Sequence, residues 1–465
     1  MKTQKIQKNI SIAERMFEAP LKSTLMFLAL PIIISYLINY FYLLGDTFFI
    51  SLINSHSSAP LSGTGLLYPV ELSFEAIAAG LATGLSATTG RLIGEGKMDK
   101  CKSLGSNGLI LGLVITIPVT ILCYAFGPQI IDLLSGSELS PEASKYALDY
   151  LYGIVPGIIF MVLSQIIGGI LVGQGLASVT TKGFMIMTAL NFILDPVLMF
   201  VFDLGVFGAG LGTSISLFFS FVYVFVYTLK GKSVIPIKFR FSFADKATMS
   251  QILHIGVPQL LMTVSMYIIS GVYNKIITTN YPQDTMNAWT LVGRVDQILI
   301  IPIIAIASAT IVLISQNYGR NNIERIKKAM SFNLKFAVGL CFALSVIYMI
   351  SSHWIFSIFT DIDSVINLAS KQVLFTALST CFTAINWVIA AFFQATGKPI
   401  LGVIILYIRV AITIGCAFFA QYVLNGDIYS IFICVVAGNI LSAPFAFALL
   451  QKELKTLSFK SVLTT

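Results

Sequence analysis

The chain has 465 residues, of which 56% are hydrophobic and only 11% are charged, and its mean hydropathy is +0.87. Soluble proteins carry about 25% charged residues, so this composition excludes an ordinary soluble domain. The net charge of +8 raises the question of a nucleic-acid partner, which the placement of the charges along the chain answers below.

Twelve apolar segments, each long enough to cross the hydrocarbon core of a membrane, follow one another along the chain. This pattern predicts an all-α membrane protein with twelve transmembrane helices. In chain order we place these helices at residues 22–50, 61–88, 104–127, 144–172, 182–202, 207–229, 251–280, 284–314, 329–352, 369–395, 399–422 and 427–450.

The charges between these segments predict the orientation in the membrane. If both termini are cytoplasmic, most of the 29 lysine and arginine residues fall in cytoplasmic segments. The opposite loops are acidic instead, and they contain Glu142, Asp203 and Asp361. This is the positive-inside pattern of membrane proteins, and it explains the basic net charge without a nucleic acid. We therefore predict a multi-pass protein of the cell membrane (inner or plasma membrane) with both termini in the cytoplasm.

The polar and basic stretch 230–250 predicts a cytoplasmic linker between two six-helix lobes. The N-terminal lobe is expected at 22–229 and the C-terminal lobe at 251–450. Cytoplasmic tails are expected at 1–21 and 451–465.

The two predicted lobes repeat the same short motifs in the same order. Leu30-Pro31 in the first helix matches Val257-Pro258 in the seventh, and the Gly94 loop after the second helix matches the Gly319 loop after the eighth. Six helices in each lobe make this a parallel repeat, which we call pseudo-symmetric. Internal repeats of this kind are typical of secondary transporters, which bind their substrates between the two halves.

Two aspartates, Asp46 and Asp195, lie inside long apolar runs. A charge at membrane depth costs several kcal/mol, so such a residue indicates function. With a rise of about 1.5 Å per residue, both fall in the outer half of the N-terminal lobe. Thr213 falls there too, and Asn191 precedes Asp195 by one helical turn. These four residues form the predicted coupling site for H⁺ or Na⁺.

The chemistry of either ion suits these residue types. Carboxylate, amide and hydroxyl oxygens are hard ligands for a small alkali cation. A carboxyl group that is buried beside a second one also holds a proton more readily than an exposed carboxyl group. The alternative is that each aspartate only satisfies neighbouring backbone groups and never changes its protonation.

Further charges in the predicted helices allow more than one interpretation. Glu71 and Glu75 in the second helix, with Arg294 and Asp296 in the eighth, are candidates for an ion pair or gate between helices. Substrate contact is the alternative for these four. The partner of Arg409 in the eleventh helix cannot be deduced from the sequence.

Three polar residues precede Asp46 on the first helix. Tyr36, Asn39 and Tyr42 are candidates for the substrate cavity, with ordinary helix packing as the alternative for the tyrosines. The six cysteines and three histidines are scattered along the chain, so neither a metal site nor a disulfide framework is predicted.

The chain resembles the multidrug and toxic compound extrusion (MATE) family along nearly its whole length. The resemblance rests on motifs in the family's order: Leu30-Pro31 before Asp46, Gly173-Gln174-Gly175, Asn191 to Pro196, Gly208 to Thr213, and Gln316 to Gly319. It implies two six-helix lobes in a V, a central cavity, and export driven by inward H⁺ or Na⁺.

Within that family, the aspartate pair with Asn191 and Thr213 resembles the DinF-like branch. The resemblance implies that the first helix bends in response to ion binding, and Pro31 stands where the bend would start. The tenth helix lacks the acidic residue of the NorM-like branch, so no matching cation site is expected in the C-terminal lobe.

We therefore expect a secondary active efflux transporter that exports amphipathic, cationic organic compounds by antiport with H⁺ or Na⁺. The alternative is a lipid-linked oligosaccharide flippase of the same superfamily, although a cavity rich in lysine and arginine is not evident. An enzyme is not expected, because no catalytic histidine, Ser–Lys pair or metal cluster is visible. The expected partners are small organic substrates and membrane lipids; no cofactor besides the coupling ion is expected, and the protein is expected to work as a monomer.

Overall fold

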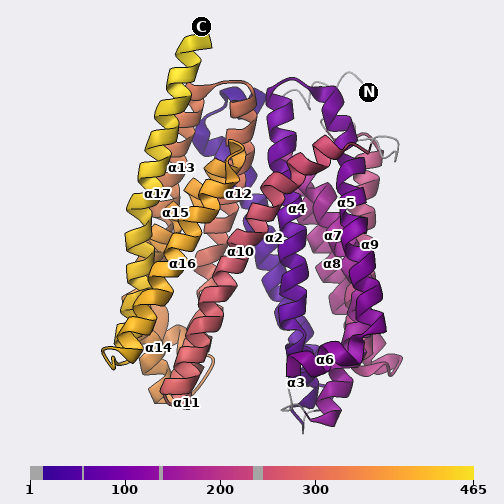
Figure 1. The fold of residues 1–465 in the computed structure, drawn as a ribbon. Helices are drawn as coiled ribbons and strands as arrows, with labels where there is room; N and C mark the ends of the chain where they lie inside the picture. The colour runs from indigo at the N-terminus through magenta and orange to yellow at the C-terminus, as the bar shows by residue number, and fades with distance from the viewer. Residues whose placement is uncertain (1–13, 55–56, 136–139, 234–243, 465) are drawn as a thin grey trace. The chain divides into compact units, whose positions relative to one another are not determined.

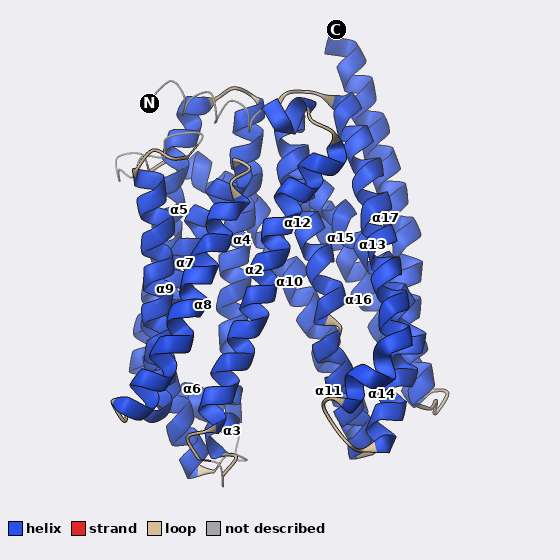
Figure 2. Ribbon diagram, turned by 180° about the vertical axis from the view of Figure 1, so that it is seen from behind, coloured by secondary structure: helices blue, strands red, loops and turns tan. Residues whose placement is uncertain are grey.

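The computed structural model describes residues 14–54, 57–135, 140–233 and 244–464. Every regular element among these residues is a helix, as Figure 2 shows. Twelve spans in the described part of the chain are long and apolar enough to cross a membrane. The prediction of an all-α membrane protein with twelve transmembrane helices is therefore confirmed.

Six spans lie in the first half of the chain. Their elements are α2 (Leu21–Ser51), α3 (Ala59–Leu66) with α4 (Tyr68–Gly94), α5 (Met98–Ala125), α7 (Pro141–Gly173), α8 (Ala177–Pro196) with the π-helical turn η1 (Val197–Val201), and α9 (Gly205–Leu229). The short helix α6 (Gly127–Ser135) follows α5.

Six further spans lie in the second half. Their elements are α10 (Lys246–Asn280), α11 (Gln283–Val295) with α12 (Gln297–Gly319), α13 (Ile323–Ser357), α14 (Asp363–Thr376) with the short 3₁₀ turn η3 (Ala377–Ser379) and α15 (Thr380–Ala395), α16 (Pro399–Tyr422), and α17 (Ile428–Thr464).

The second span of each half consists of two helices, a break that the sequence did not reveal. In the first half, α4 begins with Pro69 in its first turn, where the missing N–H costs no hydrogen bond. In the second half the break falls at Asp296, between α11 and α12. The predicted eighth helix, 284–314, is therefore two helices.

Two compact units divide the chain in a way that does not follow the chain order. The first unit contains Leu30–Val257, and the second contains Met16–Ala29 together with Pro258–Thr465. The division falls beside Pro31 in α2 and at Pro258 in α10, the two prolines that the sequence repeat aligns. The first turns of α2 therefore belong to the second unit, and the first turns of α10 belong to the first unit. The predicted lobe boundaries did not anticipate this exchange.

Contacts within each unit explain the exchange. In the second unit, Asn317 Nδ2 and Arg325 Nε donate to the carbonyl of Met16, over 3.1 and 2.9 Å. In the first unit, α4 and α10 meet backbone to backbone, because a Cβ atom on Gly84 would lie 2.3 Å from the carbonyl oxygen of Ile252. Small residues allow membrane helices this close approach.

The first unit is built around α7, which lies among α4, α5, α8 and α9 (Figure 1). Glycines on α7 allow the close contacts: a Cβ atom on Gly169 would lie 2.3 Å from the carbonyl oxygen of Ala82. The second unit has α15 at its centre, in contact with α12, α13, α16 and α17 (Figure 1).

The predicted linker and tails fall partly on described residues. Residues 1–13 of the first tail and 234–243 of the linker lie outside the described part of the chain. The end of the linker is helical, because α10 already begins at Lys246. Helix α17 continues to Thr464 and so includes most of the predicted C-terminal tail.

Candidate functional site

The four predicted coupling residues meet inside the first unit. Asn191 Nδ2 on α8 donates to Asp195 Oδ1 over 2.8 Å and to Thr213 Oγ1 on α9 over 3.2 Å. Asp46 on α2 is 6% exposed, and Asp195 is fully buried. Segments far apart in the sequence thus place two carboxyl groups, an amide and a hydroxyl in one buried site.

The carboxyl groups of Asp46 and Asp195 lie within hydrogen-bonding reach of each other. The hydroxyl of Tyr150 on α7 donates to Asp46 Oδ2 over 3.5 Å, which is a long hydrogen bond. Asp46 Oδ1 and Asp195 Oδ2 have no donor among the described residues. We call Asp46, Tyr150, Asn191, Asp195 and Thr213 the carboxylate cluster.

Glu71 on α4 lies next to this cluster, because the hydroxyl of Tyr150 is within hydrogen-bonding reach of both Glu71 and Asp46. Glu75 lies one turn further along α4 and is partly buried. The site therefore holds more acidic groups than the two aspartates alone. Among the described residues, no group of three or more histidine, cysteine, aspartate or glutamate side chains is arranged so that it could hold a metal ion.

The predicted ion pair of Glu71 or Glu75 with Arg294 would join the two units, and it stays a prediction. Arg294 is exposed on α11 in the second unit. No salt bridge involves these three residues in the described part of the chain. Asp296, the fourth member of the predicted set, also lies in the second unit, where α11 ends and α12 begins.

Two glycines make room for the cluster. A Cβ atom on Gly212 would lie 2.5 Å from Asp195 Oδ1, so α9 can approach the carboxyl group only without a side chain at this position. A Cβ atom on Gly45 would lie 2.4 Å from the ring of Phe192. Both glycines are direct neighbours in sequence of cluster residues, Thr213 and Asp46.

Helix α8 changes its geometry directly after the cluster. Pro196 has no N–H to donate to the carbonyl of Phe192, and the following turn, Val197–Val201, is π-helical. Single π-helical turns occur frequently at functional sites. The sequence indicated the missing donor at Pro196 but not the π-helical turn.

The candidate cavity residues on α2 differ in their relation to the cluster. The hydroxyl of Tyr42 lies 3.3 Å from Thr213 Oγ1, so Tyr42 contacts the cluster directly. Tyr36 and Asn39 lie earlier on α2 and are partly buried. No hydrogen bond connects Asn39 to the cluster among the described residues.

Pro31 lies inside one continuous helix, α2. Its carbonyl accepts a hydrogen bond of 2.7 Å from Thr181 Oγ1 on α8, and Ser35 Oγ donates to the same threonine hydroxyl over 2.9 Å. These contacts join α2 to α8 at the first residues of α2 that belong to the first unit. A bend of α2 at Pro31 stays a prediction.

Sequence reasoning missed Tyr150 and did not connect Glu71 with the aspartates. Tyr150 lies in an apolar run of α7, where an aromatic residue is usually a packing residue. The chain has 18 tyrosines, and no local motif distinguishes Tyr150 from the others. Only the contact between α7 and α2 reveals its role.

A family comparison identifies the chain. The MatE family model matches residues 31–197 and 258–419. The chain belongs to the MatE family. Both matched segments begin at the prolines where the chain passes between the two compact units, Pro31 and Pro258. The sequence resemblance to the MATE family is thereby confirmed, and so is the expectation of a membrane transporter rather than an enzyme.

Curated relatives of similar length support this assignment. The multidrug export protein MepA of Staphylococcus aureus is 25% identical over 433 residues, which cover 91% of this chain and 94% of the relative. MepA of Staphylococcus haemolyticus is 25% identical over 387 residues, which cover 82% of this chain and 83% of the relative.

Solved structures match the fold. An outward-facing multidrug resistance MATE family transporter of the MOP superfamily aligns with a TM-score of 0.88 at 22% identity, over 96% of this chain and 98% of the other. A MOP superfamily transporter from Pyrococcus furiosus aligns with a TM-score of 0.87 at 24% identity, over the same shares. Neither identity is high enough to assign a branch, so the DinF-like assignment stays a prediction.

Proposed function

We propose that this transporter exports amphipathic, cationic organic compounds from the cell and that inward movement of H⁺ drives the export. The names of the MepA relatives support multidrug export. The observation that carries the choice of ion is the pair of buried carboxyl oxygens, Asp46 Oδ1 and Asp195 Oδ2, which have no donor among the described residues.

A single proton between the two carboxyl groups would satisfy both oxygens. A buried polar atom without a partner costs about 1–3 kcal/mol. A proton that removes this cost for both oxygens would stabilise the cluster. The other oxygens of the pair already accept hydrogen bonds, from Asn191 and from Tyr150. These donors occupy positions that a bare cation would need, which favours H⁺ over Na⁺.

Proton binding drives transport only if it changes the balance between two conformations of the protein. A ligand shifts such a balance by its difference in affinity for the two states. The cluster joins α2, α7, α8 and α9, so loss of the shared proton removes an interaction between helices of the first unit. In our proposal, this lost interaction lets α2 bend at Pro31, and the bend changes the side of the membrane from which the substrate site is accessible.

The remaining parts of the proposal concern the setting of the transporter. It lies in the cell membrane with both termini in the cytoplasm, it acts as a monomer, and its partners are small organic substrates and lipids. The alternative of an oligosaccharide flippase has no support in the carboxylate cluster, whose charged groups are acidic and would repel a pyrophosphate.

The test uses the purified full chain in proteoliposomes with ethidium as the fluorescent cation. We compare wild type with Asp46→Asn and Asp195→Asn under an imposed pH gradient without Na⁺. Asp132→Asn is the matched control, because it removes an exposed carboxylate on α6 of the same unit. Wild type and the control are expected to transport, and both cluster variants are expected to lose transport.

Each other outcome has a clear meaning. Full transport by either cluster variant would refute the coupling role of the carboxyl pair. Transport that requires a Na⁺ gradient and ignores the pH gradient would replace H⁺ by Na⁺ as the coupling ion.

A further inference from the structure

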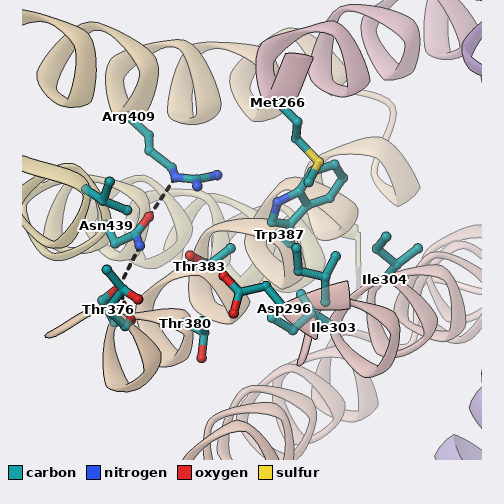
Figure 3. Close-up of a pocket in the computed structure, with 13 residues that line it drawn as sticks. Met266, Asp296, Ile303, Ile304, Thr376, Thr380, Thr383, Trp387, Arg409 and Asn439 are labelled. Carbon is teal, nitrogen blue, oxygen red and sulfur yellow. Dashed lines mark hydrogen bonds between the residues drawn. The ribbon is translucent and has the colours of Figure 1, made fainter. Parts of the chain in front are cut away.

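The second unit contains a cavity of about 110 Å³ that the proposed coupling mechanism does not use (Figure 3). It is lined by residues of α10, α12, α14, α15, α16 and α17, with Asp296 at the α11–α12 break and Ser379 from η3. All of these residues belong to the second unit. The cavity differs from the carboxylate cluster because it carries charges of both signs.

Arg409 supplies the positive charge, and a chain of hydrogen bonds fixes its orientation. Arg409 Nε donates to Asn439 Oδ1 over 2.7 Å, and Asn439 Nδ2 donates to Ser379 Oγ over 2.8 Å. Asn439 and Ser379 are buried, at 4% and 3% exposure. The Nε edge of the guanidinium is thus occupied, and Figure 3 shows its other end extending into the cavity.

Asp296 supplies the negative charge from another side of the same cavity (Figure 3). No salt bridge joins it to Arg409, and neither residue forms one elsewhere in the described part of the chain. A guanidinium and a carboxylate in a membrane protein normally pair with each other or with a ligand. Here both line one cavity without a salt bridge among the described residues, and the Tyr348 hydroxyl lies within hydrogen-bonding reach of Asp296.

The rest of the lining suits an organic ligand. The hydroxyl-bearing residues Thr380 and Thr383 lie near Asp296, and Trp387 and Met266 form an apolar side (Figure 3). A few convergent polar groups on an apolar wall are typical of small-molecule sites. A purely cationic ligand would meet Arg409 there, and a purely anionic one would meet Asp296. A ligand that carries both charges satisfies both residues.

We propose that this cavity binds the head group of an amphoteric substrate, with the substrate's carboxylate on Arg409 and its protonated amine on Asp296. The volume limits the spacing of the two charges. Arg409 and Asp296 line one small cavity, so a ligand that reaches both carries its two charges on one compact head group. The ligand is therefore a compound with an α-amino-acid-like head and an apolar or aromatic body that lies along Trp387 and Met266.

This inference rests on the proposed export function and deepens it. The two units then have different tasks: the acidic cluster of the first unit binds the coupling ion, and the cavity of the second unit selects substrates. Besides simple cations, the protein would export amphoteric compounds.

The test is a binding measurement that does not depend on transport. The chain has three tryptophans, and Trp289→Phe with Trp354→Phe leaves Trp387 as the only fluorescence reporter, on the wall of the cavity. The purified double variant is titrated in detergent with three matched probes. Phenylalanine carries both charges, its methyl ester carries only the amine, and 3-phenylpropanoate carries only the carboxylate.

We expect saturable binding of phenylalanine, with the ester and 3-phenylpropanoate at least tenfold weaker. Arg409→Gln should abolish the preference over the ester, and Asp296→Asn should abolish the preference over 3-phenylpropanoate. Arg409→Lys keeps the charge but not the planar fork of donors, so a reduced preference should remain. The control is Lys371→Gln, which removes an exposed charge of the same unit and should change neither preference.

Several results would overturn the inference. These are equal binding of the three probes, no binding of phenylalanine by the reporter protein, or unchanged preferences in both Arg409→Gln and Asp296→Asn. Thermal unfolding of each variant shows whether it is folded. If Arg409→Gln is not folded, the test uses Arg409→Lys instead.

Asp46→Asn should bind phenylalanine normally. Failure of ion coupling and failure of this cavity are therefore distinguishable.

Discussion

Asn191 donates a hydrogen bond of 2.8 Å to Asp195, one helical turn further along α8. The same amide group donates to Thr213 on α9, over 3.2 Å. The bond to Thr213 fixes the amide, and the amide in turn holds Oδ1 of Asp195, whereas Oδ2 has no donor among the described residues. The amide therefore determines which carboxyl oxygen is available to a proton.

The first prediction concerns this amide. Asn191→Leu introduces an apolar side chain of similar size and removes the donor, so that Asp195 Oδ1 loses its hydrogen bond. A buried acceptor without a partner costs about 1–3 kcal/mol, and the carboxyl group becomes free to rotate. We expect a lower unfolding temperature and a loss of export driven by a pH gradient.

Thr188→Val is the matched control for Asn191→Leu. Thr188 lies on the same helix, and its hydroxyl has no hydrogen-bond partner in the described structure. Its removal should change neither unfolding temperature nor export. If Asn191→Leu exports ethidium as well as Thr188→Val does, the amide has no part in coupling.

The second prediction concerns the close approach of α9 to Asp195. Gly212→Ala would place a methyl group 2.5 Å from Asp195 Oδ1, so the carboxyl group or the helix must move. Overpacking of this kind costs about 1–3 kcal/mol. We expect weaker coupling and a lower unfolding temperature, measured by proteoliposome export and thermal unfolding.

Gly271→Ala on α10 tests whether this effect is local. A Cβ atom at Gly271 would meet no atom within 4 Å, and alanine is favoured over glycine inside a helix by up to about 1 kcal/mol. This variant should be as stable as wild type or more stable, with normal export. Equal losses in both glycine variants would contradict the explanation by contact with Asp195.

The sequence was sufficient to predict the twelve membrane spans and the position of Asp46 and Asp195 within them, for physical reasons. Long apolar runs have few alternatives to spanning a membrane, and a carboxylate within one is conspicuous because of its cost. Helical rise and turn then place Asn191 beside Asp195. The meeting of α2, α8 and α9 in one site followed from the depth of these residues in the predicted helices.

Other features depend on contacts between helices, which leave no local signal. The partner of Arg409 is Asn439, on another helix, and neither residue is part of a motif. The break at Asp296 has no glycine or proline beside it. The exchange of the first turns of α2 and α10 between units depends on acceptors such as the carbonyl of Met16, a backbone group that every residue type provides.

The third prediction concerns that exchange. Arg325 on α13 donates to the carbonyl of Met16 over 2.9 Å and to that of Ala19 over 2.7 Å. Both bonds lie within the second unit, and they hold the chain directly before α2. Arg325→Gln should release this segment and make it more sensitive to protease, because exposed backbone without hydrogen bonds opens easily.

Limited proteolysis followed by mass spectrometry measures this release. The control is Lys328→Gln on the same helix. Among the described residues the exposed Lys328 pairs with the exposed Glu324 alone, and exposed pairs contribute little. Cleavage between Met16 and Leu21 should increase in Arg325→Gln alone. Equal cleavage in both variants would show that Arg325 does not hold this segment.

The last prediction concerns Asp245, directly before α10. Its carboxylate accepts hydrogen bonds from the backbone N–H groups of Ala247, over 3.2 Å, and Thr248, over 3.0 Å, and from the Thr248 hydroxyl. Its own N–H donates to Asn107 Oδ1 on α5 over 2.8 Å. The hydrogen bonds from Thr248 hold the pKa of Asp245 below its ordinary value, because they favour the charged form.

The direction of the shift gives the sign of the pH dependence. A carboxyl group whose pKa is lowered by folding stabilises the protein above its unfolded pKa, near 3.9 for aspartate. That stability is lost as the pH falls through the lower folded value. Asp245→Ala should therefore unfold at a lower temperature than wild type at about pH 7, and the difference should shrink below about pH 4.

Asp245→Asn keeps a neutral acceptor at the helix start, so its unfolding temperature should approach that of wild type as the pH falls. A difference between Asp245→Ala and wild type that stays constant down to about pH 2 would show that the carboxylate charge does not stabilise the start of α10.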